Sequence, residues 1–139
     1  MTSYLFDASA FITLVKKMDP AVTFQCIREA LILDLTFYEA GNAVWKETCL
    51  TKLLSPSESV ELTSSTQAVL ARVKKVESEA EDFDGILELA RGEKLSFYDS
   101  SYLYYAQEKD LKLITEDREL YRKAKKHIDV QTVTELLQT

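Results

Sequence analysis

The sequence predicts an α/β fold with a central parallel sheet, and two observations support this expectation. Short apolar segments alternate along the chain with segments of helical periodicity, and strands separated by helices pair in parallel through right-handed crossovers. Hydrophobic residues make up 46% of the 139 residues, which is enough apolar material for a normal core. Because no linker, repeat or low-complexity stretch divides the chain, we expect one domain over residues 1–139.

The first half of the chain contains two predicted strands. The segment at 36–39 (Thr-Phe-Tyr-Glu) has the spacing of a capping box, and the segment at 55–58 repeats it with Pro at the first helical position. Pro20 likewise suits a first helical turn. We therefore expect strands at 3–6 and 31–35, and helices at 8–17, at 20–31, from the capping box to about 53, and from 56 to about 71.

The second half returns to the same alternation. Gly92 is expected to end a helix, because glycine is common just after a helix C-terminus. The alternating residues at 73–77 predict an edge strand. We expect the other strands at 111–115 and 128–131, and helices at 79–90, from Ser96 or Tyr98 to Lys109, at 118–126 and at 132–138.

Glycine placement excludes two common nucleotide-binding classes. The three glycines, at 41, 85 and 92, form no Gly-x-Gly pair and do not precede a Lys-Ser/Thr pair. A dinucleotide-binding fold or a P-loop needs such glycines so that the backbone can approach a phosphate. What remains is the general rule that open parallel sheets bind ligands at the carboxyl ends of their strands.

Four acidic residues follow predicted strands or begin predicted helices: Asp7, Glu39, Asp99 and Asp117. Each one alone has a structural explanation, as a helix cap or as an acid in a first helical turn. However, Asp7 and Asp117 follow strands whose ends a doubly wound sheet places side by side. Carboxylates ~4 Å apart repel by roughly 4 kcal/mol at an effective dielectric of about 20, so a cluster needs a cation or a shared proton. The sequence therefore predicts a divalent-metal site.

Glu39 and Asn42 are three residues apart and share one face of a predicted helix. We expect them to point together into a polar cleft. The core face of this helix is expected to consist of Phe37, Ala40, Val44, Thr48 and Cys49. Asp34 is an acidic residue inside the second predicted strand. The one explanation we have for an acid there is a solvent-facing position at the end of the strand.

The composition of the chain limits which partners and which cellular compartment are expected. A net charge of −6 argues weakly against a nucleic-acid binder, but removing the four candidate ligands from the 23 acidic residues leaves 19 against 17 basic ones. Cys26 and Cys49 lie in helical patterns and are expected to be buried free thiols in a reduced compartment. No apolar run approaches the ~20 residues that span a bilayer, and no secretion signal is visible. We therefore expect a cytoplasmic protein without membrane contact.

Four acidic motifs occur in order along the chain: Phe6-Asp-Ala-Ser9, Tyr38-Glu-Ala-Gly-Asn-Ala43, Ser96-Phe-Tyr-Asp-Ser-Ser-Tyr-Leu-Tyr-Tyr-Ala106 and Leu113-Ile-Thr-Glu-Asp117. In this series they resemble the motifs of PIN domains, specifically of the small VapC-type toxins of toxin–antitoxin pairs. The resemblance covers essentially the whole chain with ordinary spacing. Asp-x-Ser alone is a weak signal, whereas the four motifs in series are fairly specific. Ser100 is a departure, because such toxins often have Ala after the third acid.

The resemblance implies a PIN-like three-layer fold, with about five parallel strands in the order 3-2-1-4-5. It also implies a magnesium- or manganese-dependent endoribonuclease that cleaves RNA and has a small antitoxin as its partner. By motif, the catalytic and metal-binding residues would be Asp7, Glu39, Asp99 and Asp117, and their polar supports would be Ser9, Asn42 and Thr115. Magnesium keeps several of its waters, so some of these acids should bind directly and others through water.

RNA binding requires positive charge around the acidic pocket. The candidates are Lys46, Arg118 and Arg122, for which a solvated helix face is the competing explanation. Tyr98, Tyr102, Tyr104 and Tyr105 could stack on bases, although aromatic residues at helical spacing more often form a core or an interface. Together with the apolar helices at 8–31, the tyrosines favour a homodimer. An antitoxin tail would present Arg or Lys to the acidic cleft.

Three other classes of function compete with a ribonuclease. A receiver-like signalling domain needs two acids after the first strand and a Lys after the last, where this chain has one acid and Gln131. A metal-dependent phosphatase needs a second acid two residues after Asp7, and Ser9 stands there. A catalytically silent PIN-like binding module stays open.

Overall fold

A five-stranded parallel sheet forms the centre of the computed structural model, which describes residues 3–17 and 25–138. The strands are β1 (Tyr4–Phe6), β2 (Ala30–Leu33), β3 (Lys74–Val76), β4 (Lys112–Ile114) and β5 (Val130–Gln131). Their order across the sheet is β3-β2-β1-β4-β5, and the described pairings are all parallel. The predicted α/β class and the order 3-2-1-4-5 are confirmed.

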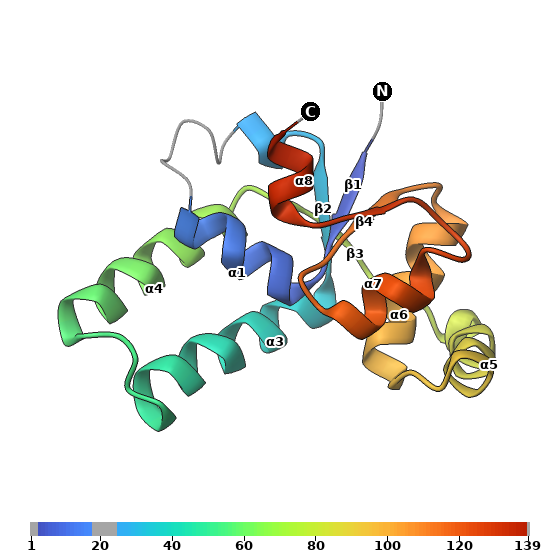
Figure 1. The fold of residues 1–139 in the computed structure, drawn as a ribbon, viewed down its shortest axis with the longest axis horizontal. Helices are drawn as coiled ribbons and strands as arrows, with labels where there is room; N and C mark the ends of the chain where they lie inside the picture. Colours follow the sequence, from blue (N-terminus) through green and yellow to red (C-terminus); the bar gives the residue numbers. More distant parts are fainter. Residues whose placement is uncertain (1–2, 18–24, 139) are drawn as a thin grey trace.

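Helices cover both faces of the sheet and complete three layers (Figure 1). One layer contains α1 (Ala8–Lys17), α3 (Asp34–Trp45), α4 (Pro56–Leu70) and α8 (Val133–Leu137), and the other contains α5 (Phe83–Glu93), α6 (Phe97–Glu108) and α7 (Arg118–Ala124). Side chains alternate between the two layers along each strand. In β1, Leu5 packs with the core under α5–α7, whereas Phe6 packs with the core under α1 and α4.

The strand order places the ends of β1 and β4 next to each other. Phe6 is in register with Ile114, and the backbone N–H of Asp7 donates to the Ile114 carbonyl over 3.1 Å. Strand β2 lies on the other side of β1, and α3 begins directly after it. The carboxyl edge of the sheet therefore brings together Asp7, the segment after β4 and the first turns of α3.

The start of α3 differs from the prediction. Strand β2 ends at Leu33 and the helix begins at Asp34, so the predicted strand at 31–35 ends too late and the capping box at Thr36–Glu39 is wrong. Instead, the Thr36 hydroxyl accepts a hydrogen bond of 3.1 Å from the backbone N–H of Leu33. Glu39 consequently lies inside the helix, one turn beyond its start. Leu33 is the N-cap residue of α3 and Thr36 its third helical residue, so the polar spacing at 36–39 predicted a helix start too late in the chain.

Asp34 has a definite structural role, which the sequence left unexplained. Its carboxylate accepts hydrogen bonds of 3.0 and 2.9 Å from the backbone N–H and the hydroxyl of Ser78, and one from the Leu35 backbone N–H. Burial alone would raise the pKa of Asp34, but these bonds outweigh it and hold the pKa below its ordinary value. Asp34 therefore ties the segment after β3 to the start of α3.

Other expectations about individual residues were also wrong. Helix α5 passes through Gly92 and ends at Glu93, and Lys94 takes the left-handed conformation with φ 55°. Phe37 is 55% exposed, since the core side of α3 is occupied by Thr36 and Ala40. Cys26 and Cys49 are free as predicted, but Cys26 is only partly buried. Cys49 is exposed in the short π-helix (Lys46–Leu50) that follows α3.

The predicted helix at 20–31 falls partly on residues 18–24, outside the described residues. Within the described part, Ala30 and Leu31 already belong to β2. Across residues 3–17 and 25–138, no helix combines the length and the apolar character needed to cross a membrane.

Candidate active site

Asp7 is a buried carboxylate at the end of β1, only 4% exposed. Its Oδ1 accepts hydrogen bonds from the Ser9 hydroxyl at 2.7 Å and from the Ala10 backbone N–H at 2.9 Å. Its Oδ2 accepts one from the Thr115 hydroxyl at 2.5 Å. Burial raises the pKa of Asp7 to about 6 against the opposing effect of these bonds, and repulsion from Glu39 adds to the rise. Asp7 thus caps α1, and it is also held by the neighbouring strand.

Thr115 connects Asp7 to Asp117. It is fully buried, and its hydroxyl oxygen accepts a hydrogen bond of 3.0 Å from the backbone N–H of Asp117 while donating to Asp7. Asp117 itself is the N-cap of α7, where its Oδ1 accepts from the Leu120 backbone N–H at 2.8 Å. Nearby, the Ser9 hydroxyl accepts from the backbone N–H of Glu116 at 3.0 Å. The predicted supports Ser9 and Thr115 therefore both contact Asp7.

Asp99 enters the site from the first turn of α6. Ser96 caps this helix, and its hydroxyl accepts a hydrogen bond of 3.0 Å from the backbone N–H of Asp99. Partial burial raises the pKa of Asp99 to about 6, and repulsion from Asp117, from Asp7 and then from Glu119 raises it further. A carboxylate with two acidic neighbours of this kind is a natural position for a cation.

Glu39 enters the site from α3. Its Oε1 accepts a hydrogen bond of 2.7 Å from the hydroxyl of Tyr102, a residue of α6 that is 1% exposed. Burial raises the pKa of Glu39, the bond from Tyr102 opposes that rise, and repulsion from Asp99 adds to it.

The four acids fit a divalent cation in their chemistry and their charge. Asp99 repels Asp7, Glu39 and Asp117, so the quartet shares one electrostatic environment at the carboxyl edge. Carboxylate oxygens are the ligands that magnesium and manganese prefer. Among the described residues, no three acidic, histidine or cysteine side chains are gathered tightly enough to enclose an ion directly. The fit to a cation therefore rests on the chemistry and charge of the four acids and not on a preformed ligand cage.

Within the described part of the chain, the other predicted site residues make no hydrogen bond or ion pair with the four acids. Asn42 is exposed on α3, and within the described residues no hydrogen bond joins it to the acids. Lys46 is exposed at the start of the π-helix, and Arg118 and Arg122 are exposed on α7, the helix that Asp117 caps. Their expected contact with RNA stays a prediction.

The four tyrosines of α6 separate into different roles. Tyr102 and Tyr105 are buried, at 1% and 2% exposure, and belong to the core. Tyr104 is partly buried and its hydroxyl donates to Asp82 at 2.8 Å. Only Tyr98 among them is strongly exposed, at 58%. Tyr102 and Tyr105 therefore take the core role that aromatic residues at helical spacing often have, and a base-stacking or dimer surface on this helix stays a prediction.

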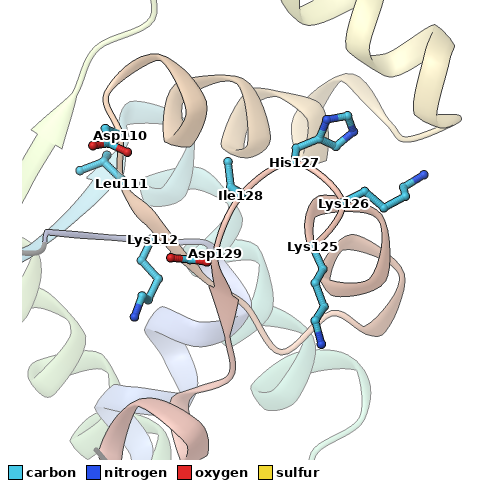
Figure 2. Close-up of a pocket in the computed structure, with 8 residues that line it drawn as sticks. All are labelled: Asp110, Leu111, Lys112, Lys125, Lys126, His127, Ile128 and Asp129. Atoms are coloured by element: carbon cyan, nitrogen blue, oxygen red, sulfur yellow. The ribbon is translucent and has the colours of Figure 1, made fainter.

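A pocket of about 610 Å³ lies at the opposite edge of the sheet (Figure 2). It is lined by Asp110, Leu111, Lys112, Lys125, Lys126, His127, Ile128 and Asp129, residues at the amino ends of β4 and β5. Lys126 and His127 pair with Glu93 at 2.7 and 2.6 Å, and the lysine side chains point in different directions. A smaller hollow of about 210 Å³ lies beside the acids and is lined partly by Thr115, Asp117 and Arg118. The carboxyl edge, with its coupled acids, is the better candidate.

Comparison with known proteins identifies the family. Residues 4–126 match the PIN domain family, and the chain belongs to it. The chain is 42% identical over 131 residues to Exonuclease VapC9 of Pyrobaculum aerophilum, covering 94% of this chain and 92% of that protein. The resemblance to VapC-type PIN domains is thereby confirmed.

Solved structures agree with this fold. PAE2754 from Pyrobaculum aerophilum superposes with a TM-score of 0.79 at 35% identity, over 99% of this chain and 88% of that one. FitAcB from Neisseria gonorrhoeae superposes with a TM-score of 0.56 at 15% identity, over 91% and 95% of the two chains, which supports the fold alone.

Sequence reasoning missed the contact between Tyr102 and Glu39. The available signal was the position of Tyr102 three residues after Asp99, which places both on one face of α6. The spacing indicated the correct face of α6, but only the folded structure shows that Glu39 of α3 is the partner of Tyr102.

Proposed function

We propose that this protein is a metal-dependent endoribonuclease, the toxin of a VapBC-type toxin–antitoxin pair. The observation that best supports this proposal is the coupling of Asp99 to Asp7, Glu39 and Asp117 at the carboxyl edge of the sheet. The likeness to a protein named Exonuclease VapC9 across most of both chains also supports a nuclease.

In this proposal the four carboxylates hold Mg²⁺ or Mn²⁺. Such an ion, when bound, would lower the pKa of a coordinated water and offset the charge of the scissile phosphate. Asp7 is the fixed member, because both of its oxygens are hydrogen-bonded within the fold. Asp99 and Asp117 approach from helix starts. Arg118 and Arg122 on α7, together with Lys46, would attract the phosphates of the RNA on either side.

Metal-dependent cleavage tests the proposal directly. The purified protein is incubated with a mixed-sequence single-stranded RNA in Mg²⁺, in Mn²⁺ or in excess chelator. We expect cleavage only with metal, and a loss of about 100-fold or more in Asp99→Asn. Asp129→Asn, at the opposite edge of the sheet, is the matched control and should cleave like the parent. Equal cleavage in chelator would end the metal hypothesis, and an inactive parent would favour the silent binding module.

Circular RNA distinguishes internal cleavage from digestion at the ends. An endonuclease linearises a circular substrate, whereas an exonuclease needs a free end. We expect the parent to cut circular and linear forms of the same RNA at similar rates. Digestion of the linear form alone would replace the endonuclease assignment with an exonuclease.

A protein partner is also part of the proposal. Helices α3 and α4 and the segment between them carry exposed apolar side chains: Phe37, Tyr38, Trp45, Leu50, Leu53 and Val60. Exposed apolar patches of this kind favour protein–protein contacts, so we propose a homodimer that binds a small antitoxin. Light scattering at micromolar concentration should give twice the 15.9 kDa chain mass. A strict monomer would contradict the dimer.

A further inference from the structure

A directed chain of hydrogen bonds ends on the Glu39 carboxylate. The Tyr102 hydroxyl lies 2.7 Å from Glu39 Oε1 and 2.8 Å from the Thr36 hydroxyl, and that hydroxyl lies 3.1 Å from the Leu33 backbone nitrogen. Tyr102 and Thr36 are both buried, at 1% and 0% exposure. The chain therefore runs through the protein interior, from the end of β2 to the acidic site.

The direction of each bond follows from the number of protons available. Tyr102 has one hydroxyl proton, and it goes to Glu39 because an ionised carboxylate only accepts. Thr36 must then donate its own hydroxyl proton to the Tyr102 oxygen. The Thr36 oxygen in turn accepts from the Leu33 backbone N–H. Every donor in the chain is used once, so the arrangement has a single orientation.

We propose that Tyr102 is a positioning residue, which fixes the Glu39 carboxylate in one orientation at the acidic site. This inference rests on the proposed metal site. Holding Glu39 in place before a cation arrives removes part of the rotamer entropy that binding would otherwise cost. Groups that orient metal ligands in this way typically change metal affinity by about 10- to 100-fold when removed.

Helix α6 contributes two residues to the acidic site, one as a carboxylate and one as a hydrogen-bond donor. Asp99 and Tyr102 are three residues apart, on one face of the helix. Asp99 supplies a carboxylate, while Tyr102 reaches across to α3 and holds the carboxylate of Glu39. A shift of α6 would therefore move one acid and release another, which couples the packing of this helix to the geometry of the site.

Tyr105 provides a matched control for a purely structural role. It is 2% exposed on the same helix, and its hydroxyl donates to Asp82 at 3.0 Å and accepts from the Glu79 backbone N–H at 3.1 Å. Neither partner belongs to the acidic quartet. Phenylalanine at either position removes one buried hydroxyl and keeps the ring, so the two variants differ mainly in which carboxylate they release.

The test measures Mn²⁺ affinity by calorimetry, with melting temperatures in chelator as a check on folding. We expect Tyr102→Phe to weaken Mn²⁺ binding about 10-fold while Tyr105→Phe binds like the parent. On RNA, Tyr102→Phe at subsaturating Mn²⁺ should lower kcat with little change in KM. Thr36→Ser, which keeps the hydroxyl, should bind Mn²⁺ like the parent, and Thr36→Val should weaken binding in the same direction as Tyr102→Phe.

Several outcomes would overturn the inference. Parental Mn²⁺ affinity in Tyr102→Phe would do so, as would equal weakening in both tyrosine variants, because either result leaves the hydroxyl with a structural role only. If Tyr102→Phe does not fold, the two Thr36 variants decide by the same criterion. The affinity measurement does not depend on catalysis. A parent that binds Mn²⁺ but leaves RNA intact would refute the ribonuclease proposal alone, and a parent without Mn²⁺ affinity would refute both.

Discussion

Asp7 and Thr115 are 108 positions apart in the chain, and the Thr115 hydroxyl donates a hydrogen bond of 2.5 Å to Asp7 Oδ2. The bond joins the ends of β1 and β4, which are neighbours in the sheet. The orientation of the buried acid is thus set by the same strand pairing that builds the fold.

Replacing Thr115 by Val should show the cost of this connection. The change keeps the shape but removes the donor to Asp7 and the acceptor for the Asp117 backbone N–H. We expect the free energy of unfolding in urea to fall by about 1–3 kcal/mol. Thr66→Val is the control, since the Thr66 hydroxyl donates only to the Leu62 carbonyl of its own helix, and it should cost less than about 1 kcal/mol. Equal costs would contradict the special role of Thr115.

Metal binding should stabilise the parent and fail to stabilise a site variant. In millimolar Mg²⁺ or Mn²⁺ we expect the melting temperature of the parent to rise by a few degrees, because a ligand of the folded state stabilises it in proportion to RT ln(1 + [L]/Kd). Asp99→Asn should lose most of this rise. Differential scanning fluorimetry with and without metal makes the comparison. If both proteins rise equally, or neither does, the four acids are separate helix caps.

The metal-free protein should show the burial and the mutual repulsion of its acids as a pH dependence of stability. Asp7 and Asp99 have pKa values of about 6, above the ordinary 3.8, so the folded state binds their protons more tightly than the unfolded state does. Their contribution to stability is fully present below about pH 4 and is lost as the pH rises through about 6. In chelator, Asp99→Asn should therefore gain in melting temperature over the parent between pH 4 and pH 7. A difference that shrinks over this range would contradict the assignment.

Removing one positive charge near the acids, and another far from them, tests the proposed RNA-binding surface. Arg118 lies beside the acids, whereas Lys125 lines the pocket at the opposite edge. In an Asp99→Asn background, Arg118→Ala should weaken RNA binding and lower the slope of log K against log salt by about 0.7, as expected for one lost phosphate contact. Lys125→Ala should leave both unchanged. Fluorescence anisotropy over a salt series measures the two quantities, and equal losses would place the RNA elsewhere.

The sequence predicted the sheet better than the local details of the site. Strand–helix alternation was sufficient for the parallel α/β class and for placing Asp7 and Asp117 at neighbouring strand ends, whereas the strand order and the role of Thr115 were implied by the resemblance to PIN domains. The capping box at Thr36 and Glu39 was wrong because Thr36 lies within the first turn of α3, where its hydroxyl also contacts that of Tyr102, 66 positions away. No local pattern encodes that contact. The same is true of Phe37, whose exposure depends on where α3 lies against its neighbours.

The central position of β1 has a consequence for biosynthesis. Asp7 leaves the ribosome before its partner Thr115, which lies 108 positions further along the chain, and before the fourth acid, Asp117. Until β4 has been translated and has paired with β1, the Thr115 hydroxyl cannot reach Asp7 and the carboxyl edge is incomplete. If the proposed function is right, a nascent chain would be inactive until β4 has been made and has paired with β1.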